Sequence, residues 1–206
     1  MNGGSRFMLI PTEPIGSVPR PQVLIDGVSS FKLGRIKQQE LDSLYDSAVR
    51  DTIQLFEATG SPVITDGEQT KSSFATYPID GLENLASDGV IIPFADGHTR
   101  QLPRLTAGPF HYVTYADRYL EKAQQYAKVP VKQAVISASA LSLLYPGEAI
   151  DGYSKEAFIQ DLLREHETDI RRCLAKGAYS VQIDFTEGRL SVKLDPTRQL
   201  LKPSSH

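Results

Sequence analysis

The sequence predicts an α/β fold built around a parallel sheet. Segments rich in β-branched residues alternate with segments whose apolar residues recur at three-to-four spacing, along most of the 206 residues. Strand, helix, strand and helix at these lengths are typical of βαβ units, in which crossover helices join parallel strands. The length suffices for one good-sized hydrophobic core, and no change of composition demands a boundary. We therefore expect a single domain over residues 1–206.

Three helices are predicted from the periodicity of apolar residues, which places them on one face of each helix. Gly60 and Gly177 are typical C-terminal stops, and Ser154 is a typical N-cap residue. Thr114 and Asp117 resemble a capping box at the start of the second helix. The three predicted helices cover residues 38–59, 115–128 and 154–176.

Three buried strands are predicted between these helices. SPVITDGE ends in polar residues, VPVKQAVISAS is rich in β-branched side chains, and AYSVQIDF stops at Asp184. A short early strand is expected before Ile15. Residues 67–108 contain Pro78, Pro93, Pro103 and several glycines, so we expect long loops there, with one short strand near 90–95.

Composition and charge exclude several classes of protein. Hydrophobic residues make up 40% and charged residues 23%, which is ordinary for a folded globular chain. The 22 basic and 25 acidic residues give a net charge of −3, so no nucleic-acid or anionic-membrane partner is expected. No segment approaches the ~20 apolar residues of a membrane span, and MNGGSRFMLI has too short an apolar run for a signal peptide. The single cysteine, Cys173, excludes an internal disulfide, and we expect a cytoplasmic protein.

Candidate binding residues stand at the carboxyl ends of three predicted strands. Ligands bind at this edge in parallel α/β folds, because loops and helix N-termini gather there. Ile15, Gly16 and Ser17 offer backbone N–H groups and a hydroxyl that suit a carboxylate. The carboxylates of Glu68 and Asp184 suit an ammonium group. Each also has an ordinary interpretation, as a plain turn, an Asp-Gly turn or a helix cap, but together they predict a site for an amino acid.

Three motifs in this order resemble the catalytic barrel of cobalamin-independent methionine synthases: TEPIGSVPRP, VITDGEQTKSSF and VQIDFTEG. That family has a strand ending in Ile-Gly-Ser before Phe-Pro, a strand ending in His-Gly-Glu, and a later Ile-Gln-Ile-Asp-Glu-Pro. LTAGPFHY and VKQAVISAS fall where the family has further barrel strands, and the similarity covers residues 10–195. The resemblance implies a (β/α)8 TIM barrel that is incomplete, with about the first five strands, and a polar tail at 196–206.

The resemblance also implies roles for the candidate residues. Ile15-Gly16-Ser17 would hold the carboxylate of homocysteine or methionine, and Glu68 and Asp184 would face its amino group. Two positions depart from the family pattern. The histidine before Gly-Glu is Asp66 in this chain, and Glu-Pro after the last aspartate is Phe185-Thr186. These changes leave the amino-acid contacts in place and indicate a divergent branch.

The family's reaction implies zinc and a methyl donor. It moves a methyl group from 5-methyltetrahydropteroyltriglutamate, a methyl-tetrahydrofolate, to the sulfur of homocysteine, and zinc ionises that thiol. The family binds zinc through a histidine, two cysteines and a glutamate, beginning with a His-x-Cys pair. This chain has no such pair, so we expect the zinc ligands to be absent from it. Its four histidines are His98, His111, His166 and His206.

Other residues with metal- or anion-binding side chains have simpler interpretations. His166, Asp169 and Cys173 share one face of the helix predicted at 154–176, but that face is apolar, so core positions are favoured over a metal site. His98 and His111 are isolated, and they are interpreted as a loop histidine and a histidine in a strand, respectively. Arg100 and Arg104 suit an anionic folate tail, although solvated loop arginines are the simpler interpretation. We therefore predict no metal ligand in this chain.

The predicted function is an S-methyltransferase of the methionine synthase type, acting in methionine biosynthesis. This chain would carry the amino-acid-binding half and be inactive on its own. One alternative is a non-catalytic barrel fragment that pairs with another chain, or with a second copy through open barrel edges. Another is a metal-free barrel resembling uroporphyrinogen decarboxylase, whose need for a cluster of basic residues this sequence meets poorly.

Overall fold

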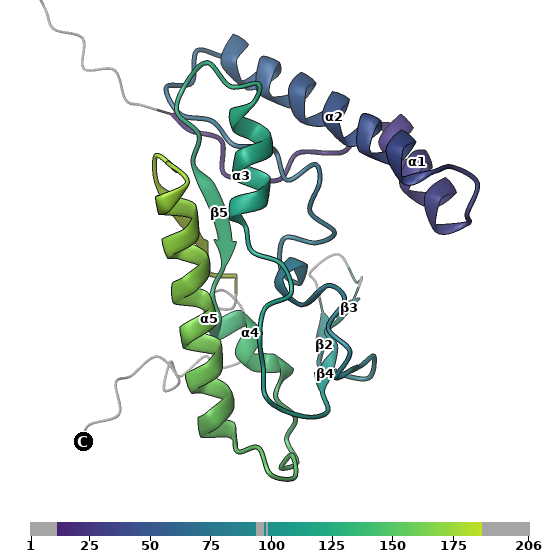
Figure 1. Ribbon diagram of the computed structural model, residues 1–206, viewed down its shortest axis with the longest axis vertical. Coiled ribbons are helices and arrows are strands. Elements are labelled where there is room, and N and C mark those ends of the chain that lie inside the picture. Colours follow the sequence, from purple (N-terminus) through teal and green to yellow (C-terminus); the bar gives the residue numbers. More distant parts are fainter. Residues whose placement is uncertain (1–11, 94–96, 98, 187–206) are drawn as a thin grey trace, which may run out of the picture. The chain divides into compact units, whose positions relative to one another are not determined.

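The computed structural model, shown in Figure 1, describes residues 12–93, 97 and 99–186. The opening segment, His98, His206 and the tail predicted at 196–206 lie outside the described residues. The chain divides into two compact units, which are described separately. The first comprises residues 12–70, 119–133 and 178–180, and the second comprises the remaining described residues. A single domain over the whole chain stays a prediction.

The first unit begins with two helices that pack against each other, α1 (Gln22–Lys32) and α2 (Gln38–Ala58) (Figure 1). Gly27 permits their close approach, because a Cβ at this position would lie 2.2 Å from Leu44 Cδ1. Helix α2 matches the helix predicted at 38–59. Helix α1 was not predicted, and its N-cap, Pro21, makes no side-chain cap that would have marked its start.

Parallel segments lie side by side in the first unit. Ile64 forms a parallel bridge with Val131, and the Lys132 N–H donates to the Ile64 carbonyl at 2.9 Å. On the other side, the Tyr179 N–H donates to the Val131 carbonyl at 2.8 Å. Within the first unit, the parts of the predicted strands at 61–68, 129–133 and 178–180 are therefore neighbours, although the first forms only this one bridge.

Helices α2 and α3 (Asp117–Gln124) supply apolar side chains to the core of these parallel segments. This packing of helices on a sheet is what βαβ units produce. Helix α3 begins three residues after Thr114, so the capping box predicted at Thr114 and Asp117 is wrong. The core residues, each at most 5% exposed, are Val49, Ile53, Ile64, Leu120, Ala123 and Val131.

The second unit contains two short antiparallel strand pairs. Strand β1 (Leu85–Ala86) pairs with β4 (Arg104–Leu105), and β2 (Ile91–Pro93) pairs with β3 (Thr99–Gln101). Strand β2 is the one strand predicted for residues 67–108, and the other three and a 3-10 turn, η1 (Tyr77–Ile79), were not predicted. The expectation that LTAGPFHY is a barrel strand is wrong, because only Leu105 of it lies in a strand and that strand is antiparallel.

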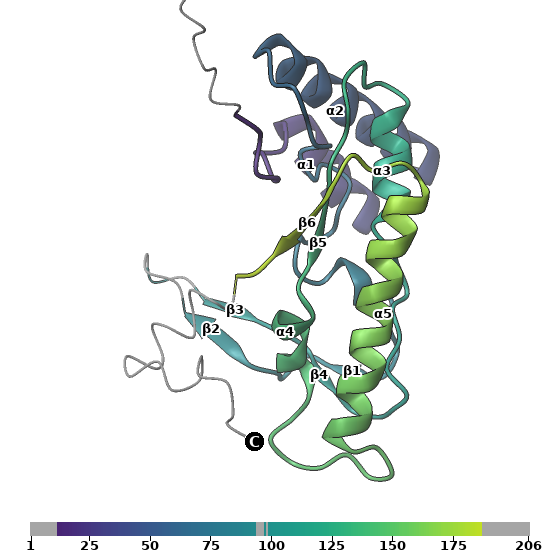
Figure 2. The ribbon, with the colours of Figure 1, turned by 90° about the vertical axis from the view of Figure 1, so that its left-hand side faces the viewer.

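Strand β5 (Gln133–Ile136) pairs with β6 (Val181–Asp184), and Figure 2 shows the two strands side by side. Helix α4 (Ala138–Leu141), the 3-10 helix η2 (Ser142–Leu144) and the long helix α5 (Lys155–Ala175) connect them. Ser154 caps α5 as predicted, since its Oγ accepts from the Ala157 N–H at 3.1 Å. Gly177 has a φ of 83°, the left-handed conformation expected of a C-terminal stop.

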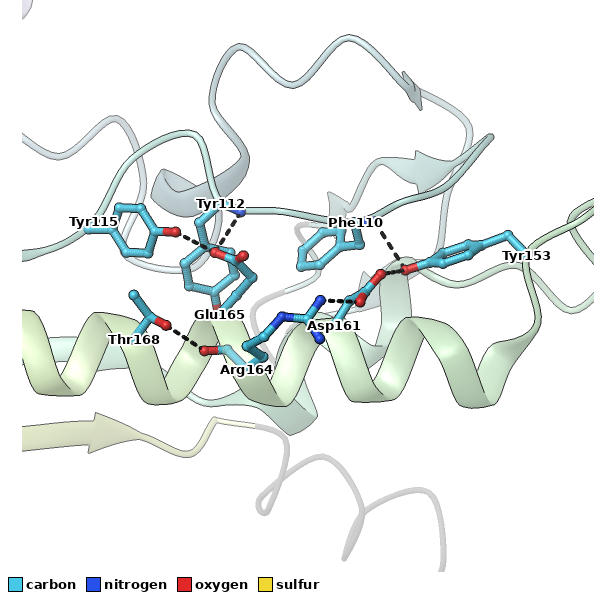
Figure 3. A network of polar contacts seen from close by, with 8 residues as sticks. All are labelled: Phe110, Tyr112, Tyr115, Tyr153, Asp161, Arg164, Glu165 and Thr168. Atoms are coloured by element: carbon cyan, nitrogen blue, oxygen red, sulfur yellow. Dashed lines mark hydrogen bonds and ion pairs between the residues drawn. The ribbon is translucent and has the colours of Figure 1, made fainter.

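Carboxylates of α5 hold the segment around Phe110, which forms neither strand nor helix. Glu165 accepts from the Tyr112 N–H at 3.2 Å (Figure 3). The Tyr153 hydroxyl donates to Asp161 at 2.5 Å and accepts from the Phe110 N–H at 3.0 Å. Backbone N–H groups that would have bonded to a neighbouring strand are thus satisfied by side chains. This explains why LTAGPFHY does not form the expected strand.

Asp169, one turn further along α5, is fully buried in the second unit. It accepts hydrogen bonds from the Tyr77 hydroxyl and from the Ala116 N–H, both at 2.6 Å. Lys71 is 1% exposed, lies 4.6 Å from the centre of the Tyr77 ring, and donates to the Ala134 carbonyl at 2.8 Å. Burial raises the pKa of Asp169 above its ordinary value, and the hydrogen bonds from Tyr77 and Ala116 oppose this rise.

None of the helices in the described part of the chain is both long enough and apolar enough to cross a membrane.

Candidate functional site

Two of the predicted binding segments meet in the first unit. The Ser17 hydroxyl donates a hydrogen bond to Glu68 Oε2, across 51 positions of the sequence. Gly16 lies beside the same carboxylate, since a Cβ at Gly16 would lie 3.8 Å from Glu68 Cδ. Ile15 is 80% exposed. The structure therefore brings the glycine-serine turn and the first of the two predicted carboxylates together.

Glu68 has a strained backbone conformation. Its φ is 55°, and it is the one non-glycine residue with a positive φ among those described. This left-handed conformation costs an L-residue roughly 1–2 kcal/mol and persists only where the surroundings hold it. Gly67 before it is also left-handed, with a φ of 64°. Such strain concentrates at binding sites, which agrees with the predicted role of Glu68.

Hydrogen bonds hold the Glu68 peptide from both sides. Its N–H donates to Asp66 Oδ1 at 2.9 Å, and Asp66 itself is 3% exposed. Its carbonyl accepts from Arg20 Nη2 at 3.1 Å, while Arg20 Nε donates to the Gln69 carbonyl at 3.0 Å. Arg20 and Gln69 were not among the residues predicted to form the site. Arg20 stands three residues after Ser17 in the same motif, and this proximity is the feature of the sequence that could have indicated its role.

The segment that carries Ser17 is docked onto the Glu68 turn. The Val18 N–H donates to the Gly67 carbonyl at 3.1 Å, and the Val18 carbonyl accepts from Gln69 Nε2 at 3.2 Å. At the other end, Lys132 Nζ lies 3.1 Å from the Glu13 carboxylate, and the Lys132 side chain is only 9% exposed. These contacts fix the distance between the two loops and keep the Ser17 hydroxyl beside the Glu68 carboxylate.

Asp184 ends strand β6 in the second unit, at the position that the sequence predicted. Its carboxylate accepts from Gln182 Nε2 at 2.7 Å, and its carbonyl accepts from the Ser137 N–H at 3.2 Å. The side chain is partly exposed. The convergence of Asp184 with Ser17 and Glu68 on one ligand stays a prediction.

The described residues do not fit the zinc site of the family that the sequence resembles. Cys173 is fully buried, and burial raises the pKa of its thiol to about 12. Asp169 is occupied by Tyr77 and Ala116, and burial lowers the pKa of the half-buried His166. Within residues 12–186, apart from the undescribed gaps, no group of three or more His, Cys, Asp and Glu side chains is arranged to hold a metal ion.

The remaining residues considered for binding have local partners. Arg104 forms a two-pronged ion pair with Asp88, with both nitrogen–oxygen distances at 3.0 Å. The Arg100 guanidinium lies 5.4 Å from the centre of the Phe74 ring. His111 is exposed. Arg100 lies in strand β3 and Arg104 in strand β4, so the interpretation of both arginines as loop residues is wrong.

Comparison with curated proteins identifies methionine synthases. The chain is 23% identical over 177 residues to the methionine synthase of Sulfurisphaera tokodaii, covering 85% of this chain and 52% of that protein. It is 23% identical over 188 residues to that of Saccharolobus solfataricus, covering 87% and 54%. A stretch of 73 residues is 32% identical to that of Saccharolobus islandicus, covering 35% and 22%. No protein-family model matches the chain.

Solved structures give the same result. A B12-independent methionine synthase from Shewanella sp. W3-18-1, in complex with selenomethionine, superposes with a TM-score of 0.67 at 19% identity, covering 92% of this chain and 55% of that one. A candidate vitamin-B12-independent methionine synthase from Listeria monocytogenes gives 0.62 at 20% identity, covering 86% and 53%. In fold and in sequence, this chain is similar to B12-independent methionine synthases, and it spans about half the length of those it matches.

Proposed function

We propose that this chain binds L-methionine or L-homocysteine at the Ser17–Glu68 contact, as the amino-acid-binding half of a methionine synthase-type S-methyltransferase. The contact itself carries the proposal, because it joins two motifs that are 51 positions apart through a hydroxyl and a buried carboxylate. The relative from Shewanella, solved with selenomethionine, supports an amino acid as the ligand class.

The chemistry of the two loops suits a zwitterion. Glu68 is 4% exposed, so its carboxylate attracts an ammonium group more strongly than an exposed one would. The Ser17 hydroxyl donates to Glu68 in this structure, and it is free to rotate toward the carboxylate of a bound amino acid. Backbone N–H groups of the Gly16–Ser17 turn would add donors to the same carboxylate. In this proposal Asp184 is the second acceptor for the ammonium group.

The proposed architecture is the first part of a (β/α)8 barrel. The parallel neighbours around Ile64, Val131 and Tyr179 follow the order of successive barrel strands. Methyl transfer itself belongs, in this proposal, to the length of the relatives that this chain does not span, where the resemblance puts zinc and the methyl-tetrahydrofolate site. In this proposal, the chain alone binds the amino acid without methyl transfer.

Isothermal titration calorimetry with L-methionine and L-homocysteine tests the proposal on the wild type and Glu68→Gln. The variant keeps the shape of the side chain and removes its charge, so affinity should fall roughly 10- to 100-fold, the range for a lost hydrogen bond to a charged group. Glu83→Gln, at an exposed position of the second unit, is the matched control and should bind like the wild type. Absence of binding to the wild type, or equal binding by Glu68→Gln, would refute the assignment.

Asp184→Asn examines the second carboxylate. If Asp184 faces the same ammonium group, the affinity for L-methionine should fall about tenfold, because one charge-assisted contact is lost. Titration of Glu68→Gln and Asp184→Asn together measures their coupling. Fully wild-type affinity in Asp184→Asn would remove Asp184 from the site and leave the Ser17–Glu68 contact standing.

A further inference from the structure

A second buried carboxylate belongs to the turn that carries Glu68. Asp66 is 3% exposed, and Asp66 Oδ1 accepts the Glu68 N–H at 2.9 Å. One residue earlier, Thr65 Oγ1 accepts the Gly67 N–H at 3.1 Å. In each case a short polar side chain bonds the backbone two residues ahead, which is how Asp and Thr stabilise turns. Two such turns in succession lead into the left-handed residues Gly67 and Glu68.

The hydrogen bond that Asp66 accepts holds Glu68, the residue with the strained backbone conformation. Glu68 has a φ of 55°, which L-residues adopt only when neighbouring groups hold them there. Without the Asp66 carboxylate, the buried Glu68 N–H would lose this acceptor, and a return to negative φ would become favourable. Such a rotation of the backbone would redirect the Glu68 side chain away from Ser17. Arg20, which donates to the Glu68 carbonyl at 3.1 Å, holds the other side of the same residue.

We propose that Asp66 is a positioning residue of the amino-acid site, which holds the Glu68 peptide so that the Glu68 carboxylate faces the ligand. This inference rests on the proposed function for its effect on binding. The effect of Asp66 on the Glu68 peptide is independent of the proposed function. Asp66 stands where the methionine synthase motif has histidine. The hydrogen bond from the Glu68 N–H to an aspartate is therefore a feature of this chain.

The binding experiment compares two ligands that differ by the amino group, L-methionine and 4-(methylthio)butanoate. Asp66→Ala removes the acceptor and should weaken L-methionine about tenfold, while Asp66→Asn keeps Oδ1 and should stay within about threefold of the wild type. The acid without an amino group does not use Glu68, so its affinity should change less than about twofold in either variant. Asp51→Ala, at an exposed position of α2, is the matched control. Equal losses for both ligands, or no loss in Asp66→Ala, would overturn the positioning role.

A readout without ligand separates this inference from the proposed function. The exchange rate of the Glu68 amide proton, followed by NMR, should rise about tenfold in Asp66→Ala and stay near the wild-type rate in Asp66→Asn. If the wild type binds neither ligand, the proposed function fails, and amide exchange still decides the role of Asp66. If Asp66→Ala does not fold, Asp66→Ser takes its place, since its shorter hydroxyl accepts the N–H more weakly. Unchanged exchange in that variant would count against the inference.

Discussion

Asp169→Ala is expected to lower the free energy of unfolding by about 3–5 kcal/mol, the range for breaking a buried charged network. The substitution removes the acceptor of both the Tyr77 hydroxyl and the Ala116 N–H, and both donors are buried. It also removes a negative charge that interacts with the buried Lys71 ammonium, which lies over the Tyr77 ring. Urea unfolding followed by far-UV circular dichroism measures the loss, since the chain has no tryptophan to report by fluorescence.

Glu167→Ala, on the same helix, is the control for Asp169→Ala. Glu167 forms an exposed ion pair with Arg171, and such pairs contribute little to stability. Its removal should leave the urea midpoint almost unchanged. An Asp169→Ala midpoint close to that of Glu167→Ala would show that the network around Asp169 does not stabilise the second unit.

The pH dependence of stability gives a second test of Asp169. Burial raises the pKa of Asp169 in the folded state, so the folded chain binds this proton more tightly than the unfolded chain does. The stabilisation from this group is then complete below the unfolded pKa of about 3.9, and it is lost as the pH rises through the raised folded pKa. Asp169→Asn does not titrate, so its deficit relative to the wild type should shrink as the pH rises across that interval. A deficit that grows with pH would contradict the direction of the shift.

Gly67→Ala is expected to lower the free energy of unfolding by about 2–4 kcal/mol, from left-handed strain and overpacking together. Gly67 has a φ of 64°, and a Cβ there would lie 2.6 Å from Thr52 Cγ2 and 2.8 Å from Val18 Cγ2. Because the Val18 N–H bonds to the Gly67 carbonyl, the displaced loop would carry Ser17 away from Glu68. L-Methionine binding should therefore be lost together with stability.

Gly60 provides the matched control for Gly67. Its φ is 77°, and a Cβ there would meet nothing within 4 Å. Gly60→Ala should therefore cost only the left-handed strain, about 1 kcal/mol, and leave L-methionine binding at the wild-type level. Equal losses of stability in the two variants would mean that the contacts of Gly67 with Thr52 and Val18 do not matter.

Elements that depend on neighbours in sequence were predicted well. Helix α2 and helix α5 lie within a residue or two of the predicted ranges, and Ser154 caps α5 as expected. Their signals are short-range, because apolar periodicity and capping act within a few residues. Helix α1 lacked a side-chain cap and was missed, and Thr114 was assigned a cap that the structure does not use.

Where local sequence patterns gave a wrong prediction, long-range hydrogen bonds determined the structure. LTAGPFHY has the composition of a strand, but the Phe110 N–H donates to the Tyr153 hydroxyl and the Tyr112 N–H donates to Glu165, more than forty residues later. The acceptors come from helix α5 and from the loop before it, so no strand pattern in the segment itself could reveal them. Asp169 likewise accepts a hydrogen bond from the Tyr77 hydroxyl, 92 positions away in the sequence, which no local pattern could reveal.

By itself, the sequence determined the alternation of strands and helices, the order of the parallel segments and the identity of Ser17 and Glu68 as candidates. Only the tertiary structure decided that these two side chains meet, that Glu68 is left-handed, and that Asp66 and Arg20 hold it there. The physical reason is distance along the chain. Periodicity reports contacts within a few residues, whereas the Ser17–Glu68 contact closes a loop of 51 positions, held by the hydrogen bonds of Val18 and Arg20 to the Glu68 turn.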